Sequence, residues 1–316
     1  MSLILDTLEK KAKEAKRLLG ISYEQFNQLV YLVKQLHEHQ IQLREKEKVR
    51  INRQGGGNKP KLSIKDQGLL TIIYLRHNPT FQMLGIQFEG SESTAHYTFH
   101  YWQSILEQVL PPSLLEQVKK HPSEEEWIKE IIASLELIVD SWESNRERPK
   151  DYQEQKSCYS GKKKSHTYKN QAIILPKGED IVDVVLGELG PKSDISIWRK
   201  SQDKFKQGQK FRGDKAYVGE PQIERPHKKP PKGELTEKQK TENQESAKQR
   251  IYVEQIIRVI KIFRVAQERF RLNPQKYCSI MGTICGLVRF RIGALVFEEL
   301  KNLFFDRKIA NNKTYF

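Results

Sequence analysis

Residues 135–140 of this 316-residue chain read LELIVD, an apolar run that ends in an aspartate. Short runs rich in branched apolar side chains are typical of buried strands. Two further acidic residues stand in local settings of their own, Asp214 in the stretch GDKAY at 213–217 and Glu254 in an amphipathic segment between Arg250 and Lys261. The run predicts a buried strand that presents Asp140 at its end, and the other two acids are candidates to join it.

These three carboxylates together have the chemistry of a site for two divalent metal ions. Two magnesium ions about 3.5–4 Å apart activate an attacking oxygen and stabilise a leaving one in an in-line displacement at phosphorus. Carboxylate oxygens are the ligands that Mg²⁺ prefers, and Mn²⁺ accepts the same ligands. Singly, Asp140 and Asp214 are equally compatible with turn or cap residues and Glu254 with a solvated helix residue. As a set, Asp140, Asp214 and Glu254 are predicted to be both catalytic residues and metal ligands for phosphodiester chemistry.

Composition favours a polyanionic partner. The chain has 55 Lys and Arg against 40 Asp and Glu, which gives a formal charge of +15 and a pI near 9.5. Such an excess suits DNA, although charge alone is equally compatible with a merely soluble basic protein.

The length predicts about two domains. Three cysteines without a C-x-x-C pair argue against a disulfide framework and a zinc site. With no apolar stretch of membrane-spanning length and no signal peptide, a cytoplasmic protein without membrane contact is expected.

Residues 1–54 are predicted to form a helical arm. A capping box joins Ser22 and Gln25, and an apolar stripe follows it. Its members recur on one helix face: Phe26, Leu29, Val30, Val33 and Leu36. The stripe either packs on its own domain, which is the preferred interpretation, or pairs with a second copy. Gly55-Gly56-Gly57 then predicts a flexible joint.

Residues 58–112 predict a helix-turn-helix. Ser63-x-x-Asp66 caps a first helix through Leu75, a short helix covers Phe81–Gln87, and a Glu89-Gly90 turn leads to a longer helix capped by Ser91. The longer helix buries an apolar face made of Ala95, Phe99, Trp102, Leu106 and Val109. Two helices joined by a short glycine turn fit a DNA-binding motif, but such pairs are also common in proteins that never touch DNA.

The remainder is predicted to form a mixed domain over 130–275 and a helical C-terminal segment over 276–316. A helix capped by Ser123-x-x-Glu126 leads into the strand that ends at Asp140. Further elements are expected in this order: strands at 171–175 and 181–189, a helix at 194–205, a strand at 210–217 that delivers Asp214, a mobile loop at about 225–246, and helices at 246–270 and 282–303.

Five local motifs resemble those of the DDE transposases of bacterial insertion sequences, in particular the insertion-sequence-five-like group. The matches are LIVD at 137–140 with Arg148-Pro149 downstream, YSGKKK at 159–164 with His166-Thr167 and Lys169-Asn170-Gln171, GPKSD at 190–194, DKAY at 214–217, and the spacing Arg250-x3-Glu254-x6-Lys261. The chain departs from the group at Ala247, where a tyrosine is usual, and at Ser141-Trp142, where small residues are usual. The helix after Ser91 also lacks the Arg and Lys expected of a DNA-reading surface.

This resemblance implies a mixed α/β (α+β) fold, with a ribonuclease H-like core preceded by the all-α helix-turn-helix domain. It implies a DNA transposase that uses Mg²⁺ to cut transposon ends and to transfer the released 3′-hydroxyl strand into target DNA. The implied partner is double-stranded DNA, both terminal inverted repeats and target. It also implies an active homodimer and a bacterial, nucleoid-associated location.

Eleven residues are predicted to contact DNA. They are Lys162, Lys163, Lys164, His166, Lys169, Arg250, Lys261, Ser93, His96, Tyr97 and His100. Lysines track phosphates without reading bases, although a solvated hairpin gives the same pattern. Arg250 and Lys261 could instead pair with Glu254 along the helix surface. His166 has no second histidine at metal-ligand spacing, so it is treated as a phosphate or structural contact. For Asp194 a helix N-cap is the leading interpretation, with a supporting role beside the metals left open.

Three other functional classes compete with this interpretation. One is a DNA-binding relative without catalysis, which the presence of all three carboxylates disfavours. Another is a metal-dependent nuclease that cuts without joining, whose site would look identical in sequence. The third is a helical adaptor, which the strand-rich region between Asp140 and Tyr217 disfavours.

Overall fold

The computed structural model describes residues 2–47, 60–119, 122–230 and 233–295. The chain divides into two compact units, residues 1–110 with 293–316 (unit 1) and residues 111–292 (unit 2). Each unit is described by itself. No helix in the described ranges is both long enough and apolar enough to cross a membrane.

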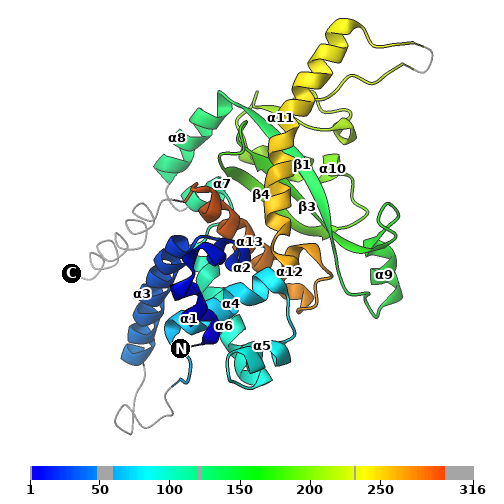
Figure 1. Cartoon of the computed structure of the whole chain (residues 1–316). Helices are drawn as coiled ribbons and strands as arrows, with labels where there is room; N and C mark the ends of the chain where they lie inside the picture. Colours follow the sequence, from blue (N-terminus) through cyan, green and yellow to red (C-terminus); the bar gives the residue numbers. More distant parts are fainter. Residues whose placement is uncertain (1, 48–59, 120–121, 231–232, 296–316) are drawn as a thin grey trace. The chain divides into compact units, whose positions relative to one another are not determined.

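Unit 1 is helical (Figure 1). Its elements are α1 (Leu3–Lys10), the 3-10 turn η1 (Ala12–Glu14), α2 (Ala15–Leu19), α3 (Tyr23–Glu47), α4 (Ile64–His77), α5 (Phe81–Gln87) and α6 (Glu92–Val109).

The predicted arm is helical but broken. Gly20 ends α2 in the left-handed conformation, with φ 82°, which only glycine adopts at little cost. The predicted capping box then starts α3, since Ser22 N donates to Gln25 Oε1 at 3.0 Å and Gln25 N donates to Ser22 Oγ at 3.1 Å. The arm is therefore made of separate helices, and the predicted capping box is confirmed.

The apolar stripe of α3 packs inside unit 1. Phe26, Leu29 and Val33 are buried, and His37 Nδ1 lies 2.7 Å from the Tyr101 hydroxyl of α6. The arm and the helix-turn-helix thus share one core, as the preferred interpretation expected. This stripe is not available to a second copy, and the triple glycine at 55–57 lies outside the described residues.

The helix-turn-helix has the predicted caps. The hydroxyl oxygens of Ser63 and Ser91 accept backbone N–H groups at the starts of α4 and α6. In the turn, Glu89 and not Gly90 takes the left-handed conformation, with φ 54°. Glycine is needed instead at Gly85 of α5, where a Cβ atom would lie 2.9 Å from the backbone carbonyl of Ser91. Close approach of α5 to the start of α6 therefore depends on this residue.

Unit 2 is a sheet with helices on both faces. Its elements are α7 (Leu114–Val118), α8 (Pro122–Ala133), β1 (Glu136–Asn145), α9 (Tyr152–Cys158), β2 (Tyr159–Ser160), β3 (Ser165–Ile174), β4 (Ile181–Leu189), α10 (Asp194–Ser201), η2 (Gln202–Lys204), β5 (Lys210–Arg212), η3 (Lys215–Tyr217), β6 (Ile223–Glu224), α11 (Glu237–Lys261), α12 (Arg264–Gln267), η4 (Pro274–Lys276) and α13 (Tyr277–Ile292).

The main sheet has the order β4-β3-β1-β5-β6. β1 lies at its centre, antiparallel to β3 from Ile138↔Ile174 to Asn145↔Thr167 and parallel to β5 up to Ile138↔Arg212. β4 is antiparallel to β3, and β6 is parallel to β5. Three antiparallel strands followed by two parallel ones, in this order, are the expected ribonuclease H-like sheet.

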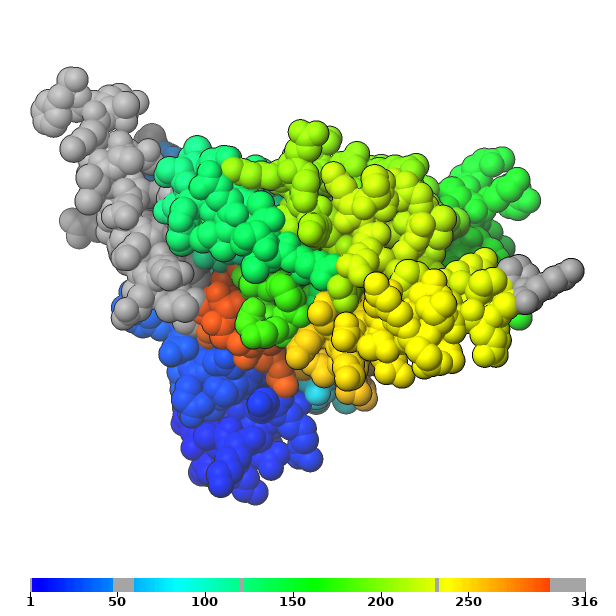
Figure 2. All heavy atoms as spheres, turned by 90° about the horizontal axis from the view of Figure 1, so that it is seen from above, coloured from blue at the N-terminus to red at the C-terminus, as the bar shows by residue number. Residues whose placement is uncertain are grey.

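α11 covers one face of the sheet and continues beyond its edge (Figure 1). In Figure 2 its yellow atoms lie along one side of the green atoms of unit 2. α10 lies on the opposite face, where Trp198 packs with Val139, Phe211 and Tyr217 in the main core. α13 is anchored to the start of β4 by a fully buried guanidinium, since Arg289 Nε donates to Asp180 Oδ1 at 2.6 Å.

Several predicted boundaries in unit 2 were wrong. β1 continues five residues past Asp140, because its polar second half pairs with β3. β3 begins at Ser165, before the predicted 171, and β5 ends at Arg212, before Asp214. α8 begins at Pro122, so Ser123 is a helical residue and not a cap.

The predicted loop at 225–246 is partly helix. α11 begins at Glu237, where Thr236 and Gln239 form a capping box, and the chain before it is held by His227 N donating to Asn243 Oδ1 at 2.7 Å. α11 also ends at Lys261 and not near Phe270. The predicted helix at 282–303 matches α13 as far as Ile292, and its last part lies outside the described residues.

Gly85→Ala tests the close approach in the helix-turn-helix. We expect the free energy of unfolding of unit 1 to fall by about 1–3 kcal/mol, because the added methyl group meets backbone atoms that cannot rotate away. Urea denaturation, with amide hydrogen exchange of residues 64–109 to localise the effect, measures it. Gly90→Ala is the matched control, since its Cβ would meet Thr94 side-chain carbons at 3.7 Å and the Phe88 carbonyl oxygen at 3.9 Å, which are ordinary contact distances. Equal stability of the two variants would contradict the explanation.

Candidate active site

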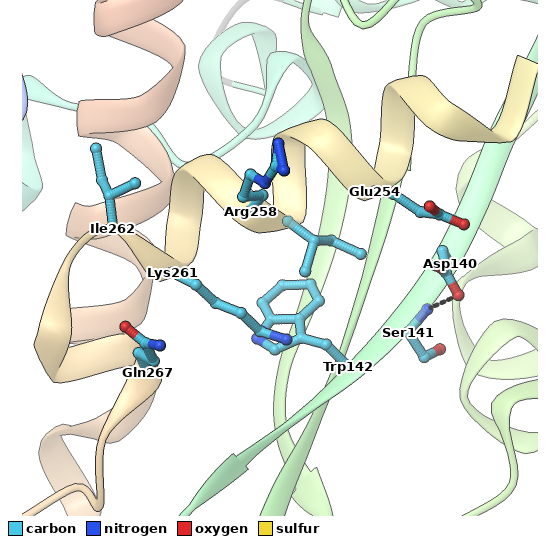
Figure 3. Close-up of a pocket in the computed structure, with 9 residues that line it drawn as sticks. Asp140, Ser141, Trp142, Glu254, Arg258, Lys261, Ile262 and Gln267 are labelled. Atoms are coloured by element: carbon cyan, nitrogen blue, oxygen red, sulfur yellow. Dashed lines mark hydrogen bonds between the residues drawn. The ribbon is translucent and has the colours of Figure 1, made fainter.

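Asp140 lies on the face of β1 that α11 covers. Alternate residues of a strand share a face, so Trp142 and Ser144 point to the same side. Ser144 Oγ donates to the carbonyl of Ala266 in α12, 3.1 Å away, which confirms the direction of this face. Asp140 and Glu254 line one hollow between β1 and α11 (Figure 3). The structure thus brings together two of the three predicted acids.

Burial raises the pKa of Asp140 from 3.8 to about 6. The backbone N–H of Ser141, 2.8 Å from Oδ1, and the charge of Arg250 lower the pKa, whereas Asp214 and Asp194 raise it. Asp140 has no ion-pair partner among the described residues. Its negative charge is therefore incompletely compensated, and a bound cation would be favoured beside it.

Asp214 follows β5 directly and caps η3. Its Oδ1 accepts the backbone N–H of Ala216 at 2.8 Å. Because Ile138 pairs with Arg212, two residues before each acid, the parallel register brings Asp214, in the turn after β5, to the level of Asp140 in the middle of β1. Gly213 allows this turn, since a Cβ there would lie 2.8 Å from the ring of Tyr217.

Glu254 reaches the hollow from the middle of α11. Its side chain is 60% exposed, and Arg250 Nη2 lies 3.7 Å from its Oε1. Arg250 thus makes the helix-surface pair that was the alternative to DNA contact. Lys261 makes no such pair; it lines the same hollow as Glu254.

The three acids are chemically suited to bind a divalent metal ion. All three offer hard carboxylate oxygens, and the raised pKa of Asp140 reflects a charge that a cation would stabilise. In the described ranges, however, no three acidic, histidine or cysteine side chains are gathered closely enough to hold one ion together. The roles of Asp140, Asp214 and Glu254 as metal ligands stay a prediction.

A buried hydrogen-bond network lies on the opposite face of β1. Gln171 of β3 pairs with Ser141 in register, and its Nε2 lies 3.2 Å from Ser141 Oγ, 3.0 Å from the Tyr217 hydroxyl and 3.1 Å from the carbonyl of Asp194. Burial raises the pKa of Tyr217 well above its usual value, so the hydroxyl keeps its proton. The network joins the strand of Asp140 to the turn of Asp214.

Asp194 lies next to this network and is not an N-cap. Ser193 caps α10, and Asp194 is the first helical residue. Its Oδ1 forms an ion pair with Lys169 Nζ at 2.7 Å, and both side chains are largely buried. Lys169 is therefore engaged inside the protein on the α10 face, away from the hollow.

Three lysines form an exposed turn between β2 and β3. Lys162, Lys163 and Lys164 have no ion-pair partner in the described part of the chain, whereas His166 is half-buried with its ring against Tyr159 at 5.5 Å. Lys163 acts on the hollow: burial and the charge of Lys163 lower the pKa of Lys261, and Asp140 raises it. The lysine turn therefore lies close enough to Lys261 for the charge of Lys163 to act on it.

The surface of α5 and α6 is uncharged or acidic, and the basic residues of the helix-turn-helix lie in and before α4. Ser93, His96 and Tyr97 of α6 are exposed, with Tyr97 at 74%, and His100 is half-buried against Phe99. No lysine or arginine occurs between His77 and Lys119, a stretch that contains four glutamates.

Several residues of the site carried no functional prediction. Gln171 and Tyr217 were noted only as parts of motifs, and Trp142 only as a departure from the expected small residue. Arg258 and Gln267 of the hollow were not considered. Sequence spacing could have indicated two of them. Trp142 lies two residues after Asp140, on the same face of one strand, and Arg258 lies one helical turn after Glu254.

Comparison with family models gives two matches. Residues 139–289 match the model described as DDE superfamily endonuclease, and residues 60–112 match the helix-turn-helix of DDE superfamily endonuclease. The two ranges correspond to most of unit 2 and to α4–α6.

A curated relative covers most of the chain. It is the probable transposase for insertion sequence element IS702 of Microchaete diplosiphon, 31% identical over 287 residues, which span 89% of this chain and 95% of the relative. Among solved structures, a Mos1 transposase paired-end complex with left transposon end is aligned over 80% of this chain and 83% of its own, at 9% identity and a TM-score of 0.21.

Asp140→Asn should stabilise the metal-free protein at neutral pH. Above about pH 6 the buried carboxylate is charged, whereas the amide is neutral and still accepts the Ser141 N–H. Because the folded-state pKa is raised, this cost is present at high pH and disappears as pH falls below about 4, where Asp140 is protonated in both states. Urea denaturation in EDTA should show a gain on the order of 1–2 kcal/mol at pH 7.5 that vanishes at pH 4.

Asp66→Asn is the contrasting control. Burial acts to raise the pKa of Asp66, but hydrogen bonds from Ser63 and Ser2 outweigh it and lower the pKa. Its carboxylate therefore stabilises the fold above about pH 4, and the variant should lose stability at pH 7.5. An Asp140→Asn protein less stable than wild type at that pH would contradict the account of the site.

Proposed function

This chain belongs to the DDE superfamily, among the transposases of insertion sequences, and on that basis we propose that it cuts transposon ends and joins them to target DNA with divalent metal ions. Hydrolysis would release a 3′-hydroxyl, which then attacks a target phosphodiester in a second in-line step without a covalent protein intermediate. The observation that carries this proposal is the half-buried, unpaired Asp140 facing Glu254 across one hollow.

In this proposal Asp140, Asp214 and Glu254 hold the metal ions. Two Mg²⁺ ions, or Mn²⁺ in their place, would supply charge that activates the attacking oxygen and stabilises the leaving one. The protein's own part is placement. β1 carries Asp140, and the turn after β5 carries Asp214 beside the same part of β1. The hydrogen bond between Gln171 and Tyr217 fixes these two segments to each other.

Basic residues around the hollow would hold the DNA backbone. Lys261 is half-buried beside Asp140 without an ion-pair partner in the described ranges, which supports a contact to the phosphate near the cut. Lys162, Lys163 and Lys164 would extend that contact along the backbone. Arg250 is available to phosphate only by leaving Glu254, and Lys169 only by leaving Asp194.

The helix-turn-helix would recognise the terminal inverted repeats through Ser93, His96, Tyr97 and His100. Uncharged side chains suit contacts to base edges better than to phosphates. An active homodimer, a cytoplasmic and nucleoid-associated location, and membership of the insertion-sequence-five-like group belong to the same proposal. The buried stripe of α3 does not contribute to the homodimer.

Alanine at Asp140, Asp214 or Glu254 should abolish cleavage and joining of the element's own DNA ends in Mg²⁺. The loss should be at least about 10³-fold, because an essential metal ligand disappears. Gel assays of nicked and joined products measure it, and binding to the same DNA should stay within about threefold.

Glu245→Ala is the matched control, an exposed glutamate on α11 away from the hollow, and it should keep full activity. Cleavage retained by all three site variants would overturn the proposal. Wild-type cleavage without joined products would identify a nuclease that does not transfer strands, and binding without any cleavage would identify an inactive relative.

Replacing Lys162, Lys163 and Lys164 together by Gln should flatten the salt dependence of DNA binding. If all three contact phosphates, the slope of log K against log salt falls by up to about 3, since fewer counterions are released. The control replaces Lys10, Lys34 and Lys119, which change the net charge equally but already pair with carboxylates. Identical slopes for the two triple variants would exclude the turn as a phosphate contact.

A further inference from the structure

Two histidines lie side by side on the surface of α6. His96 and His100 are four residues apart, so they lie one helical turn from each other on the same face of the helix. The centroids of their rings are 4.4 Å apart, with 66° between the ring planes. His96 is exposed and His100 is half-buried. The two imidazoles therefore meet at a surface that solvent reaches.

Aromatic neighbours hold the two rings in place. The ring of Phe81 in α5 lies 4.9 Å from the His96 ring and 6.2 Å from the His100 ring, and the Phe99 ring lies 5.1 Å from that of His100. Ordering a free surface side chain on a ligand costs entropy, and this packing supplies much of the order in advance. The χ2 torsion of histidine is soft, so each ring can still turn to aim a nitrogen at a shared ligand.

The charges near the pair favour a cation. Residues 78–118, which include α5 and α6, contain no lysine or arginine. Glu92 is exposed and lies one turn before His96 on the same face of α6, so its carboxylate adds negative charge beside the rings. A divalent ion held by the two rings would thus meet no cationic side chain of α5 or α6.

We propose that His96 and His100 bind one transition-metal ion of the class of Zn²⁺, Ni²⁺ and Cu²⁺. Two histidines at this spacing on one helix face can both ligate a zinc ion, and imidazole nitrogens suit all three metals. In the described ranges no third acidic, histidine or cysteine side chain is gathered with them closely enough to be a ligand, so water completes the coordination. Mg²⁺ does not bind here, because it prefers oxygen ligands.

This site goes beyond the function proposed above. It uses nitrogen ligands on a helix of unit 1, whereas the proposed catalytic site uses carboxylates of unit 2, and metal binding by the pair requires neither DNA nor cleavage. A bound ion would occupy ring nitrogens that the proposed function assigns to base contacts. Metal and DNA would therefore act on the same face of α6.

Calorimetric titration of the full-length protein with Zn²⁺, in excess Mg²⁺ that occupies carboxylate sites, tests the pair. His96→Gln and His100→Gln should each weaken Zn²⁺ binding about tenfold or more, because either change removes the gain from joining two ligands on one helix. The double variant should lose little beyond either single one. His39→Gln is the matched control, since His39 is exposed on α3 without a histidine one turn away, and this variant should bind Zn²⁺ as the wild type does.

A footprint on the wild-type protein makes the test independent of how the variants fold. Zn²⁺ should protect His96 and His100 from modification by diethylpyrocarbonate and leave His39 as reactive as before, which mass spectrometry of peptides measures. Wild-type affinity in the double variant, an equal loss in the His39→Gln protein, or unprotected His96 and His100 would each overturn the proposal. Losses of the single variants that add up in the double variant would also overturn it, because they would indicate two histidines that bind independently.

Discussion

The charge of Asp140 is the constraint on which unit 2 depends. A carboxylate in the central strand of a sheet is expensive to bury, and burial is the largest cause of the rise of its pKa to about 6. Beside Asp140 the parallel neighbouring strand ends early. β5 stops at Arg212, so the space beside Asp140 is occupied by the turn of Asp214 instead of a further strand. The early end of β5 thus opens the site beside Asp140 and also positions Asp214 there.

Rigidity is supplied from the other side of the same strand. Ser141, adjacent to Asp140, is held by Gln171 and Tyr217 in a buried network, and Gly213 lets the tyrosine ring pack closely. The two faces of β1 therefore have separate tasks: the α11 face exposes unpaired charge, and the α10 face fixes the backbone that carries it. Such division is common where a strained or charged site must be held by its surroundings.

The sequence predicted those features that depend on local chemistry. Caps at Ser22, Ser63 and Ser91 were correct because a cap is a contact over three residues. The caps predicted at Ser123 and Asp194 were wrong, because each of these residues lies inside its helix. Glu254 and Lys261 are seven residues apart on α11 and line one hollow, which agrees with their helical spacing. Boundaries set by distant partners were wrong: the polar half of β1 is a strand only because β3 pairs with it. The composition of residues 225–246 predicted a mobile loop, although the start of α11 carries a capping box formed by Thr236 and Gln239. The contacts of Gln171 with Tyr217 and Asp194 join segments 23 or more residues apart, and no local pattern reveals them.

The stretch from His77 to Lys119 lacks lysine and arginine between its ends. Many DNA-binding proteins combine long-range attraction to DNA and base recognition in one surface, and in this chain the two would be separate. Long-range attraction to DNA grows with positive charge, and it also allows a protein to slide along nonspecific sequence. α5 and α6 contribute nothing to that attraction. If the chain binds DNA as proposed, capture from solution and one-dimensional search would fall to its basic remainder, and α5 and α6 would add affinity only where base contacts are favourable. The residence time that these two helices contribute should then depend on sequence more than on ionic strength.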